Sequence, residues 1–172
     1  MVKGPVTTSV YLSVFSLALM FLALLPSGDG FPDGAPIEAC ILPHPNRPNH
    51  PGTKAQPPQA SKHAFTASSA NYHPGTTITV LISGTPFKGY FVQARDSHSN
   101  DWIGEFEETK ETKVYPECSA VTHSTVPPKT NVRLTWRAPH DRSGTVFFTG
   151  TILERYDKYW SDLVAKVPNP RF

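Results

Sequence analysis

Charged residues are scarce in this sequence, and the charges that it does carry nearly cancel. Of its 172 residues, 17% are Asp, Glu, Lys or Arg, and the formal net charge is +2. No run of five or more like charges occurs. Proteins that bind nucleic acids usually carry a basic stripe interleaved with aromatic residues. We therefore expect no nucleic-acid partner.

Motifs of catalysis and metal binding are also missing. No two of the seven histidines stand at i, i+4 or in an HxH pair, and no HExxH motif occurs. No serine lies in a GxSxG elbow, and there is no glycine-rich phosphate loop. The sequence predicts a protein that is not an enzyme and has no metal site and no cofactor. We expect His44 and His50 to be loop histidines and His123 to hydrogen-bond a neighbouring strand.

The first thirty residues have the composition of a secretory signal peptide. Lys3 supplies a positive start, residues 10–25 (VYLSVFSLALMFLALL) are apolar, and Gly28, Asp29 and Gly30 suit a signal peptidase. A membrane anchor is the alternative, because about 16 apolar residues approach the roughly 17 needed to span a bilayer. We predict a signal peptide at 1–30 and a secreted, extracellular product of residues 31–172 without a membrane span.

Cysteine is rare, and Cys40 and Cys118 are the only two cysteines in the sequence. In an oxidising extracellular compartment, two cysteines in a small domain predict one disulfide. A zinc site is a weaker interpretation, since neither residue has a CxxC partner. N-glycosylation is not expected, because no Asn-x-Ser/Thr acceptor occurs.

Proline, in contrast, is abundant, and it gathers near the start of the predicted mature chain. Residues 31–60 include the stretch ILPHPNRPNHPGTKAQPPQA, in which each proline removes a backbone donor and restricts the residue before it. We expect a proline-rich arm that lies over the main domain and is fixed at Cys40, with residues 46–60 as its loosest part.

Patterns of period two dominate the rest of the chain. In residues 72–95, Ile78, Val80 and Ile82 alternate with Thr77, Thr79 and Leu81, and this alternation places the first set on a buried face. Gly84 and Pro86 predict a break between two strands. Further strand candidates are 102–106, 118–123, 131–136 and 145–153. The pattern predicts an all-β fold, an immunoglobulin-like β-sandwich of about seven to eight strands.

The C-terminal tail follows another period. Tyr156, Tyr159, Trp160, Leu163, Val164 and Val167 recur with the spacing of an amphipathic helix. The spacing predicts a short C-terminal helix that Pro168 ends. An irregular extended tail is the alternative, since aromatic and β-branched residues lower helix propensity.

Several basic residues are candidates for binding an anionic ligand: Lys88, Arg95, Arg133 and Arg137. Arginine forms charge-assisted hydrogen bonds with phosphate and carboxylate groups. Arg95 and Arg137 have an alternative structural role, in which they tie strand ends together.

Six segments of the sequence, taken in order, resemble the reeler domain family. They are FPDGAPIEAC, YHPGTTITVLISG, FKGYFVQAR, CSAVTHS, LTWRAP and GTVFFTGTIL. The resemblance covers residues 31–160 and is closest to the short secreted invertebrate members called defense proteins, and to noduler. It implies a role in innate immunity and binding to microbial surface components. Family members of the ferric-chelate reductase type continue into a DOMON domain and a haem-bearing membrane unit, so their activity is not carried over.

Two classes of function therefore remain open. The first is a secreted immune protein that binds microbial surface components, such as lipopolysaccharide or other cell-wall glycans, through one face of the sandwich. The second is an extracellular matrix or cell-surface interaction domain without an immune role. A truncated relative of the ferric-chelate reductases that lacks the haem module is a further alternative.

Overall fold

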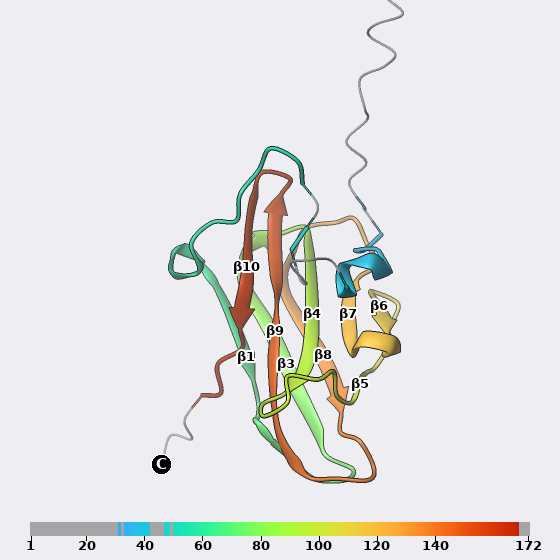
Figure 1. The fold of residues 1–172 in the computed structure, drawn as a ribbon. Coiled ribbons are helices and arrows are strands. Elements are labelled where there is room, and N and C mark those ends of the chain that lie inside the picture. The colour runs from blue at the N-terminus through green and yellow to red at the C-terminus, as the bar shows by residue number, and fades with distance from the viewer. Residues whose placement is uncertain (1–30, 32, 42–46, 49, 169–172) are drawn as a thin grey trace, which may run out of the picture. The chain divides into compact units, whose positions relative to one another are not determined.

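The computed structural model describes residues 31, 33–41, 47–48 and 50–168. Two β-sheets pack face to face in these residues, with β9 and β10 in front of β1 and β3 in Figure 1. This arrangement confirms the predicted all-β sandwich. The predicted signal peptide lies outside the described residues. Within them, no helix is long and apolar enough to cross a membrane.

The first sheet, which we call the four-stranded sheet, is antiparallel throughout. Its strands in spatial order are β1 (His63–Ala67), β3 (Thr77–Phe87), β8 (Lys129–Arg137) and β5 (Glu105–Phe106). Burial alternates along β3, where Ile78, Val80 and Ile82 are all fully buried, as predicted. The other side of this sheet faces solvent.

The second sheet, which we call the six-stranded sheet, is also antiparallel. Its main path runs β10 (Lys158–Val164), β9 (Gly144–Arg155), β4 (Gly89–Asp96), β7 (Ala120–His123) and β6 (Thr112–Tyr115), and β2 (Asn71–Tyr72) pairs with β9. The described residues thus form ten strands, against the seven to eight expected. The sequence located six of them, and β1, β2, β6 and β10 were not located. Three 3₁₀ turns complete the structure: η1 (Ile37–Cys40), η2 (Pro58–Ala60) and η3 (Pro116–Cys118).

The hydrophobic core lies between the two sheets and is rich in aromatic rings. Trp136 of β8 is fully buried and meets Phe148 of β9 edge to face, with ring centroids 5.7 Å apart. Its indole Nε1 donates a hydrogen bond of 2.9 Å to the Ile103 carbonyl. Burial of this large side chain is stabilising because its polar atom also has a partner.

The predicted break at residues 83–86 is wrong. β3 continues to Phe87, and the pairing of β3 with β8 only becomes irregular between Ser83 and Phe87. Gly84 has a φ of +143°, and a Cβ there would lie 2.5 Å from the Lys62 carbonyl oxygen. The glycine therefore permits a close approach of the chain before β1 rather than ending the strand.

The predicted C-terminal helix is also wrong, since residues 158–164 form β10. Trp160 pairs with Ile152 of β9 and points into the core, whereas Tyr159 lies on the other face, and both are buried. A register irregularity follows at Asp162, whose φ is +57°. Buried residues on both faces of a strand abolish the alternation of period two, and this explains the misleading helical spacing.

The proline-rich arm covers the outer face of the six-stranded sheet. The turn η1 packs on β4 and β7, where Ala39 and Cys40 form a second small core with Phe91. Further along, the Gln56 amide donates to the Tyr159 carbonyl (2.8 Å), and Arg47 pairs with Asp162 (2.6 Å). Two described residues of 46–60 are therefore bonded to β10, and that this segment is the loosest part of the arm stays a prediction.

Candidate functional site

The predicted disulfide is present and holds the arm against the sandwich. Cys40 of η1 and Cys118 of η3 are bonded with an S–S distance of 2.03 Å, and both residues are buried. The bond closes a sequence separation of 78 residues. Nearby, the Tyr115 hydroxyl donates to the Ala35 carbonyl (2.6 Å), so the arm is also held at a second point, before Cys40 in the chain.

The four predicted ligand-binding residues do not converge on one site. Lys88 lies at the turn between β3 and β4, and Arg95 lies near the far end of β4. Seven residues of extended strand separate them by about 23 Å. Arg133 and Arg137 are on the exposed side of β8, in the other sheet.

Arg95 takes the structural role that was the alternative for it. Its Nη1 donates to the Asn100 carbonyl (2.9 Å) and its Nη2 donates to the Gln93 Oε1 (3.1 Å). Burial lowers the pKa of the guanidinium, partly offset by Asp101. Its donors hold the loop that follows β4, so Arg95 is not a free anion-binding group.

Arg133 and Arg137 share a face but differ in their partners. Arg137 forms an ion pair with Glu107, with Nε and Oε1 2.5 Å apart. Among the residues that the structure describes, Arg133 has no carboxylate partner, and it lies directly opposite Leu81 in the register of β3 and β8. Of the four predicted residues, Arg133 is thus the arginine that remains available on the open face.

Strand register extends this face into a row of four residues, which we call the cationic row. Arg133 is opposite Leu81, Leu81 is opposite Thr66, and Thr66 forms a parallel bridge with Lys166. Adjacent strands are about 4.8 Å apart, so the Arg133 and Lys166 backbones lie about 14 Å apart. Lys166 is exposed and, within the described chain, has no acidic partner.

The rows beside the cationic row are polar and uncharged. On one side, Ser83 is opposite Asn131, and on the other, Thr79 is opposite Thr135. These hydroxyl and amide groups are hydrogen-bond donors, so the face presents a row with a cation at each end, flanked by rows of neutral donors. Such an arrangement suits a ligand that carries anionic groups and hydroxyls.

Sequence reasoning missed Lys166 and Thr66. Lys166 lies within the tail that the sequence predicted as a helix, and its bridge to β1 joins residues 100 positions apart. The presence of a lysine after a strand does not indicate which other strand it will pair with. The alternation of period two that would have indicated β10 is absent, because residues on both faces of β10 are buried.

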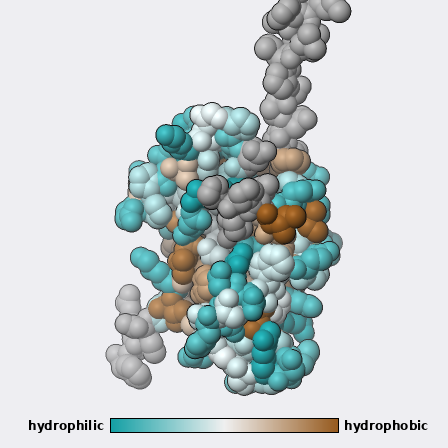
Figure 2. Space-filling model, in the orientation of Figure 1, coloured by the Kyte–Doolittle hydropathy of each residue, from teal (hydrophilic) through white to brown (hydrophobic). Residues whose placement is uncertain are grey.

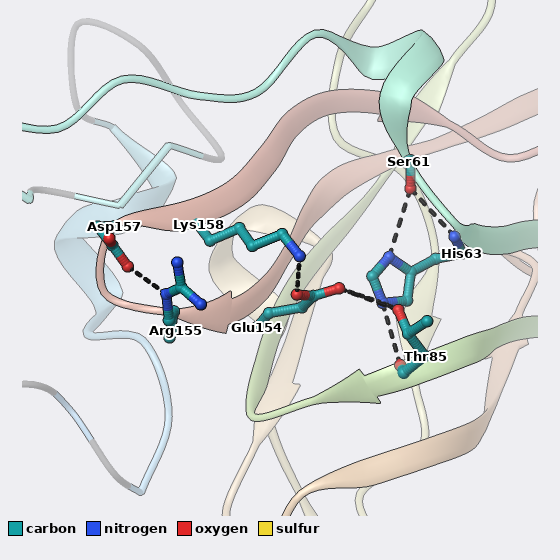
Figure 3. Close-up of polar contacts among 7 residues, drawn as sticks. All are labelled: Ser61, His63, Thr85, Glu154, Arg155, Asp157 and Lys158. Carbon is teal, nitrogen blue, oxygen red and sulfur yellow. Dashed lines mark hydrogen bonds and ion pairs between the residues drawn. The ribbon is translucent and has the colours of Figure 1, made fainter.

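A polar cluster at one end of the sandwich surrounds His63 (Figure 3). The His63 Nε2 donates to the Thr85 carbonyl (3.1 Å), while Nδ1 lies 3.4 Å from the Ser61 Oγ. The Thr85 hydroxyl donates to Glu154 (2.9 Å), which also pairs with Lys158 (2.5 Å). These contacts join strands of both sheets and leave the imidazole enclosed.

The pKa values in this cluster indicate a structural role. Burial lowers the pKa of His63 and outweighs the opposing effects of the Thr85 carbonyl and the Glu154 charge. For Glu154, burial favours the neutral acid, but hydrogen bonds from Lys158 and Thr85 outweigh it and leave the pKa below its ordinary value. The cluster is a neutral, enclosed histidine beside an ion pair.

The other two histidines that the sequence singled out and the structure describes also make structural contacts. His123 accepts a hydrogen bond of 3.4 Å from the Tyr90 amide of the neighbouring strand, as predicted. His50 stacks on Tyr156 with ring centroids 4.2 Å apart and bonds the Tyr156 carbonyl (2.7 Å), so it is not a free loop histidine. His44 lies outside the described residues. In the described part, no three His, Cys, Asp or Glu side chains gather as a metal site.

Comparison with known proteins places the chain in context. The family model of the Reeler domain matches residues 39–170. "Putative defense protein 3" of Antheraea mylitta is 30% identical over 154 residues, which cover 86% of this chain and 91% of that protein. The crystal structure of the human F-spondin reeler domain (fragment 2) is 25% identical, with a TM-score of 0.52 over 68% of this chain and 92% of that chain.

A much longer relative matches almost the whole chain. "Putative ferric-chelate reductase 1" of Xenopus laevis is 32% identical over 168 residues, which cover 92% of this chain but 26% of the reductase. The chain thus spans about a quarter of the length of that relative.

Proposed function

The chain belongs to the Reeler domain family, and from this membership we propose that it is a secreted defense protein that binds microbial surface components. The membership confirms the resemblance seen in the sequence. The proposed binding surface is the outer face of the four-stranded sheet, centred on the cationic row. The proposed role is binding rather than catalysis.

The insect relative supports the defense role, because that similarity extends over nearly the full length of both proteins. Similarity to the ferric-chelate reductase is confined to about a quarter of that protein. The reductase name therefore supports a shared domain and gives no reason to propose reductase activity. The Cys40–Cys118 disulfide is in keeping with an extracellular location.

The observation that carries the proposal is the contrast between the two outer faces. The arm covers β4 and β7 with η1 and runs along β10, so much of the outer face of the six-stranded sheet is buried. The outer face of the four-stranded sheet is not covered by the arm, and its residues are half-exposed or exposed and, apart from Leu81, mostly polar. Arg133 and Lys166 bring positive charge to it, and microbial surface polymers commonly carry phosphate or carboxylate groups.

The cations are expected to act through charge-assisted hydrogen bonds rather than long-range attraction. The net charge of +2 is too small to steer a polyanion strongly. Exposed charges separated by more than about 8 Å are screened at physiological salt. Binding should therefore need close contact with the cationic row and should weaken as salt is raised.

A retention experiment tests this proposal. Residues 31–172 would be incubated with whole bacteria, with lipopolysaccharide and with chitin, and the bound fraction measured over a range of protein and salt concentrations. We expect saturable, salt-sensitive retention on bacteria and lipopolysaccharide. The double variant Arg133→Gln/Lys166→Gln should bind at least about tenfold more weakly, because two charged donors are lost.

The matched control is Lys54→Gln/Lys110→Gln. It removes the same two positive charges from exposed positions in the arm and in the β5–β6 loop. Equal weakening of both double variants would show that net charge matters and the face does not. Absence of retention by the unmodified protein would overturn the defense role and favour the matrix or cell-surface function.

A further inference from the structure

Trp102 differs from the other two tryptophans of the chain in its exposure. Its side chain is 38% exposed, whereas Trp136 and Trp160 are 0% and 2% exposed. Tryptophan carries the largest apolar surface of any side chain, and it recurs at the centres of binding sites. The exposed part of the Trp102 indole is not packed in the core, so it is available for contact with a partner.

The loop that carries Trp102 is held by a dense set of hydrogen bonds. The Asp96 carboxylate accepts from the backbone amides of His98 (2.8 Å) and Ser99 (3.1 Å). The Asn100 amide donates to the Asp96 carbonyl (3.0 Å), and the Asp96 amide donates to the Asp101 carbonyl (2.9 Å). Since these bonds fix the backbone on the N-terminal side of Trp102, the ring starts from a defined position.

Arg95 fixes the indole from the side of β4. Trp102 pairs with Arg95 in an antiparallel bridge, and the guanidinium carbon lies 6.0 Å from the ring centroid. The guanidinium is itself held by the Asn100 carbonyl and the Gln93 side chain. The tethered guanidinium lies over one face of the ring, so the indole is held in place before a ligand binds its exposed part.

The surroundings of the ring indicate the chemistry of its partner. Residues 97–101 are all exposed and polar, and Trp102 is the one large exposed hydrophobic residue in 96–104. On the face of the molecule that Figure 2 shows, hydrophobic residues form small separate groups on a mostly hydrophilic surface. The centre of a protein interface is usually enriched in apolar and aromatic side chains, and the neighbouring residues 97–101 supply none. A sugar ring needs only one apolar face for stacking and a polar rim for its hydroxyls.

We propose that Trp102 is a stacking platform for a neutral pyranose ring of a polysaccharide. Arg95 is the positioning residue of this platform, and the polar side chains of residues 97–101 lie beside it as hydrogen-bonding groups for sugar hydroxyls. The platform shares no residue with the cationic row. It extends the range of ligands from anionic polymers to uncharged glycans, and it can be tested independently of the proposed function.

Tryptophan fluorescence gives a direct test, because only Trp102 is accessible to a quencher. Residues 31–172 would be titrated with chitohexaose and with laminarihexaose, and emission and acrylamide quenching would be recorded. We expect a saturable change in emission and at least a twofold loss of quenching by one of these neutral probes. Trp102→Leu should bind at least about tenfold more weakly by calorimetry, while Trp102→Phe should retain weaker binding because an aromatic ring remains.

Two controls test whether binding of the neutral probes depends on Trp102 itself. Arg133→Gln/Lys166→Gln should bind the neutral probes as the unmodified protein does, even if it no longer binds bacteria. The thermal midpoint of Trp102→Leu should show that it is folded. The proposal is overturned if neither probe alters emission or quenching up to about 10 mM, or if Trp102→Leu binds with unchanged affinity.

Discussion

The outer faces of the two sheets of this sandwich differ in how far the rest of the chain covers them. In β3 and β8 of the four-stranded sheet, buried and exposed residues alternate over most of their length. In β4 of the six-stranded sheet, residues 89–94 are buried without interruption. The difference arises because the arm packs on the second sheet and leaves the first open. An outer face that the chain covers itself is stabilised, whereas an open one remains available for binding.

Threonine illustrates the contrast between the two faces. Thr122 of the six-stranded sheet is fully buried, and its hydroxyl donates to the Tyr90 carbonyl (2.7 Å) while accepting from the Ala35 amide (3.1 Å). Thr79 and Thr135 of the four-stranded sheet are only half-buried and lie side by side in register. The same side chain thus anchors the arm on one sheet and faces solvent on the other.

The largest expected effect comes from truncating outward-facing residues on the two sheets. Phe91 lies under the arm in the second core and is 5% exposed, so Phe91→Ala should cost about 3–5 kcal/mol. Leu81 on the open face is half-exposed, and Leu81→Ala should cost about 1 kcal/mol. Chemical denaturation of both variants measures the difference. Similar losses would mean that the arm does not shield its face.

Removal of the disulfide should have the next largest effect. Cys40→Ser/Cys118→Ser is expected to lower the free energy of unfolding by about 2–4 kcal/mol. Hydrogen exchange should speed up first at the Ala35 amide, which donates to Thr122, because this part of the arm then has no covalent bond to the sandwich and is held only by packing and hydrogen bonds. If exchange in β3 rises as much as in the arm, the bond supports the whole sandwich rather than one covered face.

A smaller effect is expected from pH, through one histidine in each sheet. Burial is the main cause that lowers the pKa of His63 in β1 and of His123 in β7. The unfolded chain therefore takes up protons at a pH where the folded protein does not, beginning near pH 6.5. Stability should be fully present above about pH 6.5 and should fall as the pH is lowered from there.

Denaturation between pH 7.5 and 5.5 would measure this loss while ordinary carboxylates stay ionised. His63→Gln and His123→Gln should each flatten part of the profile. A stability that is constant or rises over this range would contradict the neutral, buried state of both rings.

The smallest effect should come from the arginines of the open face. Arg137 and Glu107 form an ion pair whose side chains are 68% and 36% exposed. Exposed pairs typically contribute less than about 1 kcal/mol, so Arg137→Gln should barely change the unfolding midpoint. Arg133→Gln, which breaks no ion pair, should leave it unchanged within about 0.5 kcal/mol. A large loss from either variant would assign that arginine to the structure.

Alternation of period two was clearest in two strands of the four-stranded sheet that have one wet face. The alternation in residues 77–82 and 131–136 identified β3 and β8 and their buried sides. It failed for β10, where Tyr159 and Trp160 are both buried because one faces the arm and the other the core. A covered outer face removes the polar residues from which strand periodicity is recognised.

The candidate site was only partly predictable for a related reason. The sequence identified Arg133 as a candidate but could not separate it from Arg95, because the contacts of Arg95 depend on the shape of one loop. The partner cation Lys166 could not be found, since its place is fixed by a bridge to β1.

The sequence by itself determined the β-class, the single disulfide and the family, because composition, alternation and short motifs are local properties of the chain. Only the tertiary structure decided which face stays open and which cations lie in one row. Those features depend on register and on contacts between residues far apart in sequence. Burial of apolar surface selects these contacts for the chain as a whole, so no local pattern records them.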